Sequence, residues 1–216
     1  MCGRAILVAT IEVLEELFAL TEVPDLVPRF NIAPTQPIAV IRAPHRLELL
    51  RWGISLPGAK VPKINLRIES VVGNPATREL TRTARCLVII DGFYEWKREG
   101  KLALPFLFRH PDAKPFAIGG VWARSPAANG ETIDSCAMIT RAGEGAVKEL
   151  HDRMPFIVPP SDYDRWLDPT TKAKDLLAAP ADLSLVSRPV SKRVNSPAND
   201  DVGCLGPPDV AQGTLF

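Results

Sequence analysis

The sequence contains few of the residues on which metal and redox sites depend. Its 216 residues include three histidines and four cysteines, and the cysteines, Cys2, Cys86, Cys136 and Cys204, lie far apart along the chain. Zinc knuckles and CxxC redox motifs need closely spaced cysteines, so this pattern excludes both. We expect no metal ion, no cofactor and, in a reducing compartment, no disulfide framework.

Long apolar runs and an excess of one charge are also missing. No apolar run reaches the ~20 residues that span a membrane, and the first residues lack the basic and apolar pattern of a signal peptide. The formal net charge is +1, so any contact with nucleic acid must come from a local basic patch. We expect a cytoplasmic monomer with no membrane partner, associated with the nucleoid if its source is bacterial.

Strand-forming segments dominate what is present. Runs rich in β-branched and aromatic residues, separated by Gly, Pro and Asp, occupy residues 38–42, 47–52, 86–90, 93–97, 104–109, 116–122 and 135–141. Cys86 and Cys136 lie inside two of these runs, which is typical of small buried side chains. Cys204 lies in a Gly- and Pro-rich stretch, and we expect it to be incidental.

Helical periodicity is limited to short segments. We expect an amphipathic helix over residues 10–20, with Thr10 as its N-cap and Leu14, Leu17 and Phe18 on one face. Shorter helices are expected at 145–150, from 161, and at 172–179.

Strands and helices do not alternate along the chain. We therefore predict an α+β fold, a single domain with a mostly antiparallel, barrel-like β core and a few peripheral helices. The domain covers residues 1–205, and the composition of residues 206–216 indicates a loose C-terminal tail.

Cys2 follows the initiator methionine, and this position gives it chemistry that an internal cysteine lacks. Methionine is normally removed before a small residue, which leaves a free α-amine beside the thiol. Such an amine has a pKa near ~7.8 and is partly unprotonated at neutral pH, unlike a lysine amine with a pKa near ~10.4. The amine condenses with an aldehyde to an imine, and the thiol closes a five-membered thiazolidine ring.

Two further segments carry groups suited to proton transfer. In DGFYEW (91–96), Glu95 is flanked by aromatic residues, and loss of water raises the pKa of a carboxyl group. In HDRMP (151–155), His151 stands where a predicted helix meets an apolar strand, and Arg153 is suited to a phosphate. Each has an ordinary alternative, an exposed strand residue for Glu95 and a helix-capping residue for His151.

A polar stripe is predicted between residues 63 and 70. Alternation along a strand sends Asn65, Arg67 and Glu69 to one face and three apolar side chains to the other. The polar face is either the solvent side of a sheet or the floor of a polar groove.

Together and in this order, these motifs closely resemble the SRAP family, the SOS-response-associated peptidases or abasic site processing proteins. The resemblance covers nearly the whole chain and rests on MCGR (1–4), RFNIAP (29–34), RWG (51–53), INLRIES (64–70), RCL and DGFYEW (85–96), FAIGGVW (116–122), AMIT (137–140), HDRMP (151–155) and VSKRVN (190–195).

The resemblance implies a protein that binds single-stranded DNA containing abasic sites. After Met1 removal, Cys2 would form a thiazolidine crosslink with the sugar aldehyde and so shield the lesion, with lyase activity and self-removal of Met1 in addition. The implied catalytic residues are Cys2, Asn65, Glu95 and His151. The implied DNA-binding residues are Arg4, Pro34, Trp52, Arg67, Thr140 and Arg153.

Two other functions stay open on the residues alone. One is an N-terminal-nucleophile cysteine hydrolase or peptidase without a DNA role, in which His151 or the α-amine activates Cys2. The other is a non-enzymatic binding module with a polar groove. The crosslinker and the hydrolase both need Cys2, whereas the binding module does not, and only the crosslinker needs an aldehyde.

Overall fold

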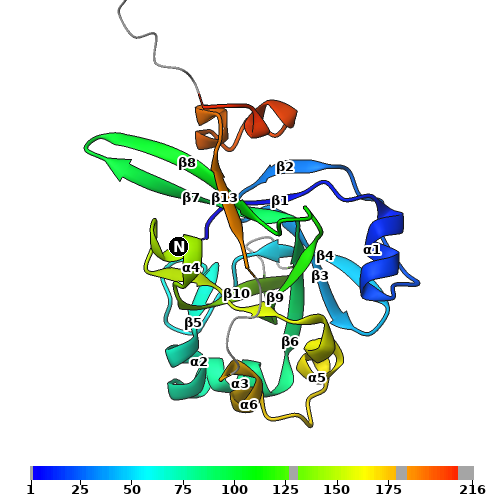
Figure 1. The fold of residues 1–216 in the computed structure, drawn as a ribbon. Coiled ribbons are helices and arrows are strands. Elements are labelled where there is room, and N and C mark those ends of the chain that lie inside the picture. The colour runs from blue at the N-terminus through cyan, green and yellow to red at the C-terminus, as the bar shows by residue number, and fades with distance from the viewer. Residues whose placement is uncertain (1, 127–130, 179–183, 209–216) are drawn as a thin grey trace, which may run out of the picture.

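Five strands close into a β-barrel at the centre of the molecule (Figure 1). They are β3 (Pro37–Ala43), β4 (Arg46–Trp52), β6 (Arg85–Ile90), β9 (Phe116–Pro126) and β10 (Thr132–Ala142). In the computed structural model, which describes residues 2–126, 131–178 and 184–208, the pairing runs β10-β4-β3-β6-β9 and returns to β10. These pairings are antiparallel except for that of β4 with β10. The predicted α+β fold with a mostly antiparallel, barrel-like core is confirmed.

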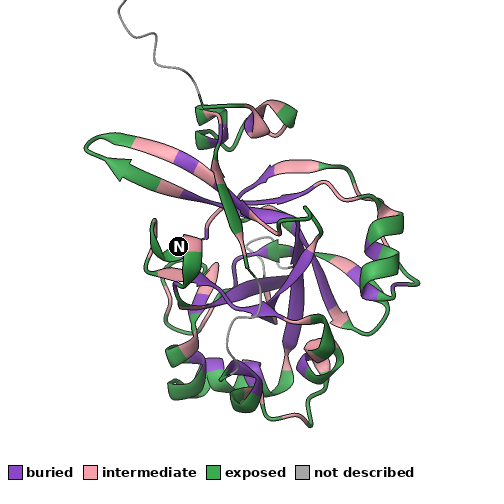
Figure 2. Cartoon of the chain, viewed as in Figure 1, coloured by how far each residue is buried: buried purple, intermediate pink, exposed green. Residues whose placement is uncertain are grey.

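The barrel strands supply most of the core, as the buried ribbon in Figure 2 shows. All six residues of β6 are buried, because a barrel wall covered by helices leaves neither face to solvent. Gly119 and Gly120 in β9 are required by close packing, since a Cβ at Gly119 would lie 2.6 Å from the Phe156 ring and one at Gly120 would lie 2.8 Å from the Ala137 carbonyl oxygen. Cys86 and Cys136 are buried in this core, as predicted.

A second sheet packs beside the barrel and carries the N-terminal residues. Its order is β13-β8-β7-β1-β2. The bounds are β1 (Ala5–Leu7), β2 (Arg29–Ile32), β7 (Gly92–Glu99), β8 (Leu102–Arg109) and β13 (Val186–Pro189). Three short strands extend the barrel sheet, β5 (Asn65–Arg67), β11 (Arg153–Pro155) and β12 (Ile157–Val158).

The helices are short and lie at the periphery, as expected. Their bounds are α1 (Ile11–Phe18), α2 (Ile68–Gly73), α3 (Pro75–Thr83), α4 (Gly145–Lys148), α5 (Tyr163–Leu167) and α6 (Ala173–Leu177), with 3₁₀ turns η1 (Pro160–Asp162), η2 (Lys192–Asn195) and η3 (Val202–Leu205). Within the described ranges, no helix is long and apolar enough to cross a membrane.

Helix α1 agrees with its predicted position but not with all of its predicted contacts. Leu14 and Phe18 are buried, whereas Leu17 is 38% exposed, so the apolar face is narrower than expected. Thr10 occupies the N-cap position, but its side chain makes no capping hydrogen bond.

Helix α2 replaces the last three residues of the strand predicted over residues 63–70, and helix α3 follows it. Strand β5 ends at Arg67, so Glu69 lies on a helix and not on the predicted polar face of a strand. The sequence of helix α3 shows no apolar periodicity because Thr77 and Thr81 form its buried face. Their hydroxyl groups donate to the backbone carbonyls of Ser70 and Thr77, respectively.

Candidate active site

Cys2 lies against the strand that carries Glu95. Strand β1 pairs antiparallel with β7, with Ala5 opposite Phe93, and the Tyr94 N–H donates to the Arg4 carbonyl at 3.0 Å. Continuing this register brings the residues before β1 alongside Glu95. Cys2 is 1% exposed, so the fold encloses the predicted nucleophile.

Asn65 fixes the backbone of Cys2. Its Nδ2 donates to the Cys2 carbonyl oxygen at 2.7 Å, and Asn65 is itself held by the parallel pairing of β5 with β10, opposite Met138. The Asn65 Oδ1 is buried and has no hydrogen-bond partner among the residues that the structure describes. A buried amide oxygen of this kind is an acceptor available to a ligand.

The surroundings of the Cys2 thiol keep it protonated. Burial raises the pKa of Cys2 well above its ordinary value, and the nearby Glu95 carboxylate raises it further. The thiol donates a weak hydrogen bond to the Arg4 carbonyl, with the sulfur 3.9 Å from the oxygen. Cys2 therefore differs from a thiolate nucleophile, which needs nearby positive charge to lower its pKa.

Glu95 is a buried carboxyl group in the wall of a cavity. It is 4% exposed, and burial raises its pKa, while an interaction with His151 opposes part of the rise. The cavity has a volume of about 510 Å³ and is also lined by Arg4, Trp96 and Asn195. A carboxyl group that retains its proton above the usual pH range is suited to general acid catalysis.

His151 reaches the same cavity from the turn between α4 and β11. Its Nδ1 accepts a hydrogen bond from the Arg153 backbone N–H at 2.9 Å. Because Nδ1 is an acceptor here, the proton of the neutral ring lies on Nε2. The fold thus fixes the tautomer of His151 and places it beside Glu95.

The three arginines implied by the resemblance are held in different ways. Arg153 forms a bidentate ion pair with Glu69 at 2.7 and 3.0 Å and donates to the Thr140 carbonyl. Arg4 donates to the Asn31 side chain and to a backbone carbonyl, both at 2.8 Å. Arg67 is exposed, and within the described ranges its guanidinium makes no ion pair or hydrogen bond. Arg67 therefore has the donors most available to a phosphate.

Three other residues implied to contact DNA differ in exposure. Trp52 and Thr140 are both 0% exposed, and their side chains donate to the carbonyls of Ile64 and Leu66, respectively. In this conformation these two side chains support β5 from within the core. Pro34 is half-buried in the turn between β2 and β3, so part of its ring is accessible.

Trp96 and Asn195 line the cavity but were not among the predicted site residues. The Trp96 Nε1 donates to the Asn195 Oδ1 at 2.6 Å, and the Arg4 guanidinium carbon lies 5.7 Å from the centroid of the Trp96 ring. Both residues belong to sequence motifs, 91–96 and 190–195, but no local pattern indicates that segments this far apart meet.

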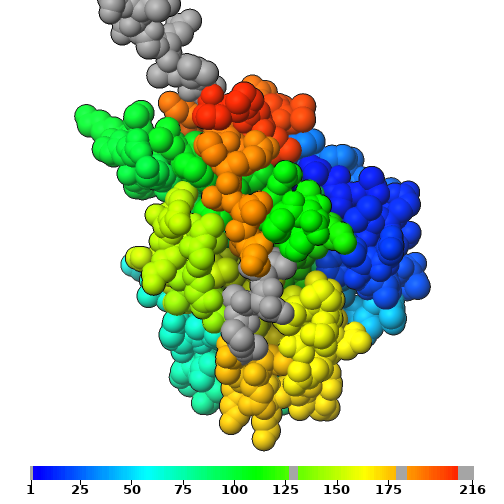
Figure 3. Space-filling model, in the orientation of Figure 1, coloured from blue at the N-terminus to red at the C-terminus, as the bar shows by residue number. Residues whose placement is uncertain are grey.

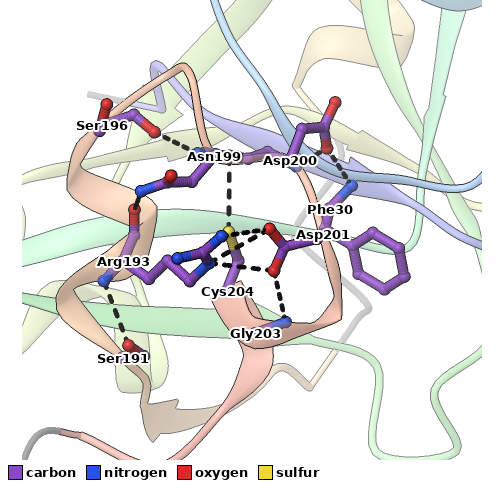
Figure 4. A network of polar contacts seen from close by, with 10 residues as sticks. Phe30, Ser191, Arg193, Ser196, Asn199, Asp200, Asp201, Gly203 and Cys204 are labelled. Atoms are coloured by element: carbon purple, nitrogen blue, oxygen red, sulfur yellow. Dashed lines mark hydrogen bonds and ion pairs between the residues drawn. The ribbon is translucent and has the colours of Figure 1, made fainter.

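The C-terminal segment is folded onto the second sheet and holds this wall of the cavity. Asp200 accepts hydrogen bonds from the Phe30 and Asn31 backbone N–H groups at 2.6 and 2.8 Å, as Figure 4 shows for Phe30. Figure 3 shows the segment, in orange and red, seated over the β7–β8 hairpin. Cys204 is fully buried in a small core with Tyr94, so the expectation that it is incidental was wrong. Residues 209–216 of the predicted tail lie outside the described residues.

Metal-ligating side chains do not gather at the site. In the part of the chain that the structure describes, no group of three or more His, Cys, Asp or Glu residues is placed to hold a metal ion. The groups that Cys2, Glu95 and His151 bring to the site are suited to nucleophilic addition and proton transfer.

Comparison with known proteins identifies relatives over almost the full length. Residues 1–197 match the family described as SOS response associated peptidase (SRAP). Abasic site processing protein YoaM of Bacillus subtilis is 32% identical over 221 residues, which cover 95% of this chain and 97% of YoaM. Abasic site processing protein YoqW of the same organism is 32% identical over 216 residues, covering 93% and 96%. A crystal structure of a Bordetella bronchiseptica protein has a TM-score of 0.74 at 27% identity, covering 88% of this chain and 100% of that one.

Proposed function

This chain belongs to the SOS response associated peptidase (SRAP) family, and we propose that it captures abasic sites in single-stranded DNA through a covalent bond to Cys2. One observation carries the proposal. The Asn65 amide holds the Cys2 carbonyl at 2.7 Å, next to a buried Glu95 that shares a cavity with His151. The names of the full-length relatives YoaM and YoqW support an abasic site as the substrate.

The covalent step starts from the α-amine that removal of Met1 leaves on Cys2. This amine adds to the aldehyde of the ring-opened sugar, and the carbinolamine loses water to become an imine. Acid-assisted loss of water leaves this imine protonated on nitrogen. The thiol then adds to the C=N carbon, the C=N electron pair returns to nitrogen, and the thiol proton passes to the base that gave up its proton in the previous step. The product is a thiazolidine that shields the lesion.

Glu95 and His151 supply the proton transfers of this sequence. Because burial raises its pKa, Glu95 keeps its proton where an exposed glutamate would lose it, and it donates that proton to the departing hydroxyl group. The resulting carboxylate then accepts the thiol proton of Cys2. His151, with its proton on Nε2, is a second donor for opening the closed sugar.

Two subsidiary activities belong to the same proposal. An imine that fails to cyclise acidifies the adjacent carbon and permits β-elimination, which gives lyase activity. Removal of Met1 by the protein itself would be a peptidase step at the same residues. A general thiol hydrolase is less well supported, because the buried Cys2 beside a carboxylate has a raised pKa and not the lowered pKa of an activated cysteine.

The DNA strand is proposed to pass over Arg67 and the cavity wall. Arg67 is the direct phosphate ligand. Arg4 and Arg153 add positive charge from positions that their contacts with Asn31 and Glu69 already fix. Pro34 contributes an accessible ring, and Trp52 and Thr140 support β5 from below. The protein acts as a monomer in this proposal.

Intact-mass measurement tests the function. The purified protein is mixed with a single-stranded oligonucleotide containing an abasic site, and with the matched uracil-containing strand as a control. We expect an adduct whose mass equals that of the protein without Met1, plus that of the abasic strand, less one water molecule. This adduct should form with the abasic strand and not with the uracil strand. Active protein that retains Met1, or an adduct with the uracil strand, would contradict the mechanism.

A further inference from the structure

A second cavity, of about 490 Å³, lies where α2, α3 and α6 meet at one end of the barrel (Figure 1). It shares no lining residue with the cavity of Glu95 and His151. Its volume is within the range of roughly 300–1,000 Å³ typical of small-molecule sites.

The side chains around this second cavity are strongly cationic. Among the described residues, its lining holds five cations, Arg78, Arg82, Arg85, Lys172 and Lys174, against one carboxylate, Glu79, in a chain whose net charge is +1. Arg82 already neutralises Glu79 through two hydrogen bonds of 2.9 and 2.6 Å. The side chains of Arg78, Lys172 and Lys174 are exposed and make no ion pair or hydrogen bond with a described residue.

Arg85 adds a buried charge beneath the cavity. It is 5% exposed, and its guanidinium donates only to backbone carbonyls, including those of Thr81 at 2.8 Å and Thr171 at 3.2 Å. The Asp168 carboxylate interacts electrostatically with Arg85 but makes no hydrogen bond to its guanidinium, and it accepts from Thr170 at 2.8 Å. A buried cation solvated by neutral dipoles makes the potential of the cavity more positive than the exposed lysines would alone.

One wall of the cavity is apolar. Val71 and Leu177 are buried behind it, and Val72 is 50% exposed at its surface. A simple inorganic anion has no apolar surface to bury against such a wall, whereas the sugar and base of a nucleotide would cover it. The combination of free cations, a buried cation and an apolar wall fits a phosphate attached to an organic group.

We infer that this cavity binds the phosphate of a nucleotide, with the sugar and base against Val72. The nucleotide is either free or part of the strand that the active site holds. The second source rests on the proposed function, and chain connectivity supports it, because α2 follows directly on β5, which carries Asn65 and Arg67. The cavity thus lies along the continuation of the element that positions Cys2.

The test uses the full chain and ligands that carry no aldehyde, so that binding stays non-covalent. Methyl signals of Val71, Val72 and Leu177 are followed by NMR during titration with thymidine monophosphate or with thymidine, which lacks the phosphate. Fluorescence anisotropy measures the salt dependence of binding to short and long oligothymidylates. Each measurement is repeated on Lys172→Gln with Lys174→Gln, and on a charge-matched control, Lys101→Gln with Lys114→Gln.

We expect thymidine monophosphate, but not thymidine, to shift the methyl signals, and the Lys172/Lys174 variant to lose the shift while the control keeps it. If the bound strand is the source, the salt slope for the long oligonucleotide also falls, by roughly 0.7 for each phosphate that the variant no longer binds. If the free nucleotide is the source, the slope is unchanged.

Methyl shifts of equal size with thymidine and with thymidine monophosphate would overturn the inference. The absence of methyl shifts, together with equal salt slopes for the Lys172/Lys174 variant and its control, would also overturn it. Crosslinking of an abasic strand by the wild-type chain is measured in parallel to separate the two proposals. Lost crosslinking with retained methyl shifts contradicts the proposed function alone. Intact crosslinking without methyl shifts or a slope change contradicts the cavity alone.

Discussion

The active-site cavity and the α2–α3–α6 cavity are close in volume, about 510 and 490 Å³, but differ in how firmly their charged side chains are held. In the first, Arg4 is tied to Asn31 and to a backbone carbonyl, and Glu95 is buried beside Cys2. In the second, Arg85 and Arg82 are held by hydrogen bonds, but Lys172 and Lys174 are exposed and make no ion pair or hydrogen bond with a described residue. A reaction needs groups held in fixed positions, whereas retention of a flexible anion needs only charge and space.

Substitution of Cys2 should have the largest effect on the active-site cavity. Cys2→Ala keeps the α-amine after Met1 removal but cannot close the ring, so we expect loss of the heat-stable crosslink. The imine should still be trapped by borohydride, and gel electrophoresis of the two treatments measures both products. A crosslink as durable as that of the parent would sink the thiazolidine mechanism.

Glu95→Gln is the next largest expected effect. The amide keeps the shape of the side chain but cannot transfer the proton, and general acid–base catalysis is typically worth ~10²–10⁴-fold. We expect crosslinking to slow by this factor in a folded protein, as measured by single-turnover kinetics and circular dichroism. An unchanged rate would assign Glu95 a purely structural role.

Asn65→Ala tests how far fixed geometry matters. The substitution removes the 2.7 Å hydrogen bond that holds the Cys2 carbonyl. A displacement of about 1 Å can cost on the order of 10²-fold in rate, so we expect up to that loss with binding of the strand nearly unchanged. A rate loss accompanied by an equal loss of binding would indicate that Asn65 acts on DNA instead of on Cys2.

Substitutions of Arg67 and Arg153 compare an arginine that makes no ion pair or hydrogen bond with a described residue and an arginine that is paired within the fold. Arg67→Gln should lower the salt slope of strand binding by roughly 0.7, the value for one phosphate on a single strand, and leave thermal stability unchanged. Arg153→Gln should lower stability, because it leaves Glu69 and the Thr140 carbonyl without their partner. Denaturation and anisotropy on both variants check this, and equal behaviour would remove the distinction.

The pH dependence of stability gives the smallest effect. Burial raises the pKa of folded Glu95 above its ordinary value of 4.5, so the folded state binds this proton more tightly than the unfolded chain. The stabilisation is complete below pH 4.5 and is lost as pH rises through the raised value. Relative to Glu95→Gln, the wild-type free energy of unfolding should therefore decline across that range in denaturant titrations, and parallel curves would contradict the raised pKa.

Local patterns predicted the barrel strands because their burial produces runs of β-branched and aromatic residues. The same reasoning failed for α3, whose buried face consists of Thr77 and Thr81. It also failed for Cys204, because the small core around Tyr94 forms only when the C-terminal segment folds back.

The family, the fold class and the candidate residues Cys2, Asn65, Glu95 and His151 follow from short motifs that each occupy a few neighbouring positions. The closure of β10 onto β4, the hydrogen bond from Asn65 to Cys2 and the pairing of Arg153 with Glu69 join residues far apart along the chain. No local periodicity encodes such contacts, because side-chain period reports only which face of an element is buried and not what packs against it. Which arginine side chains are paired with another described residue was therefore decided by the tertiary structure.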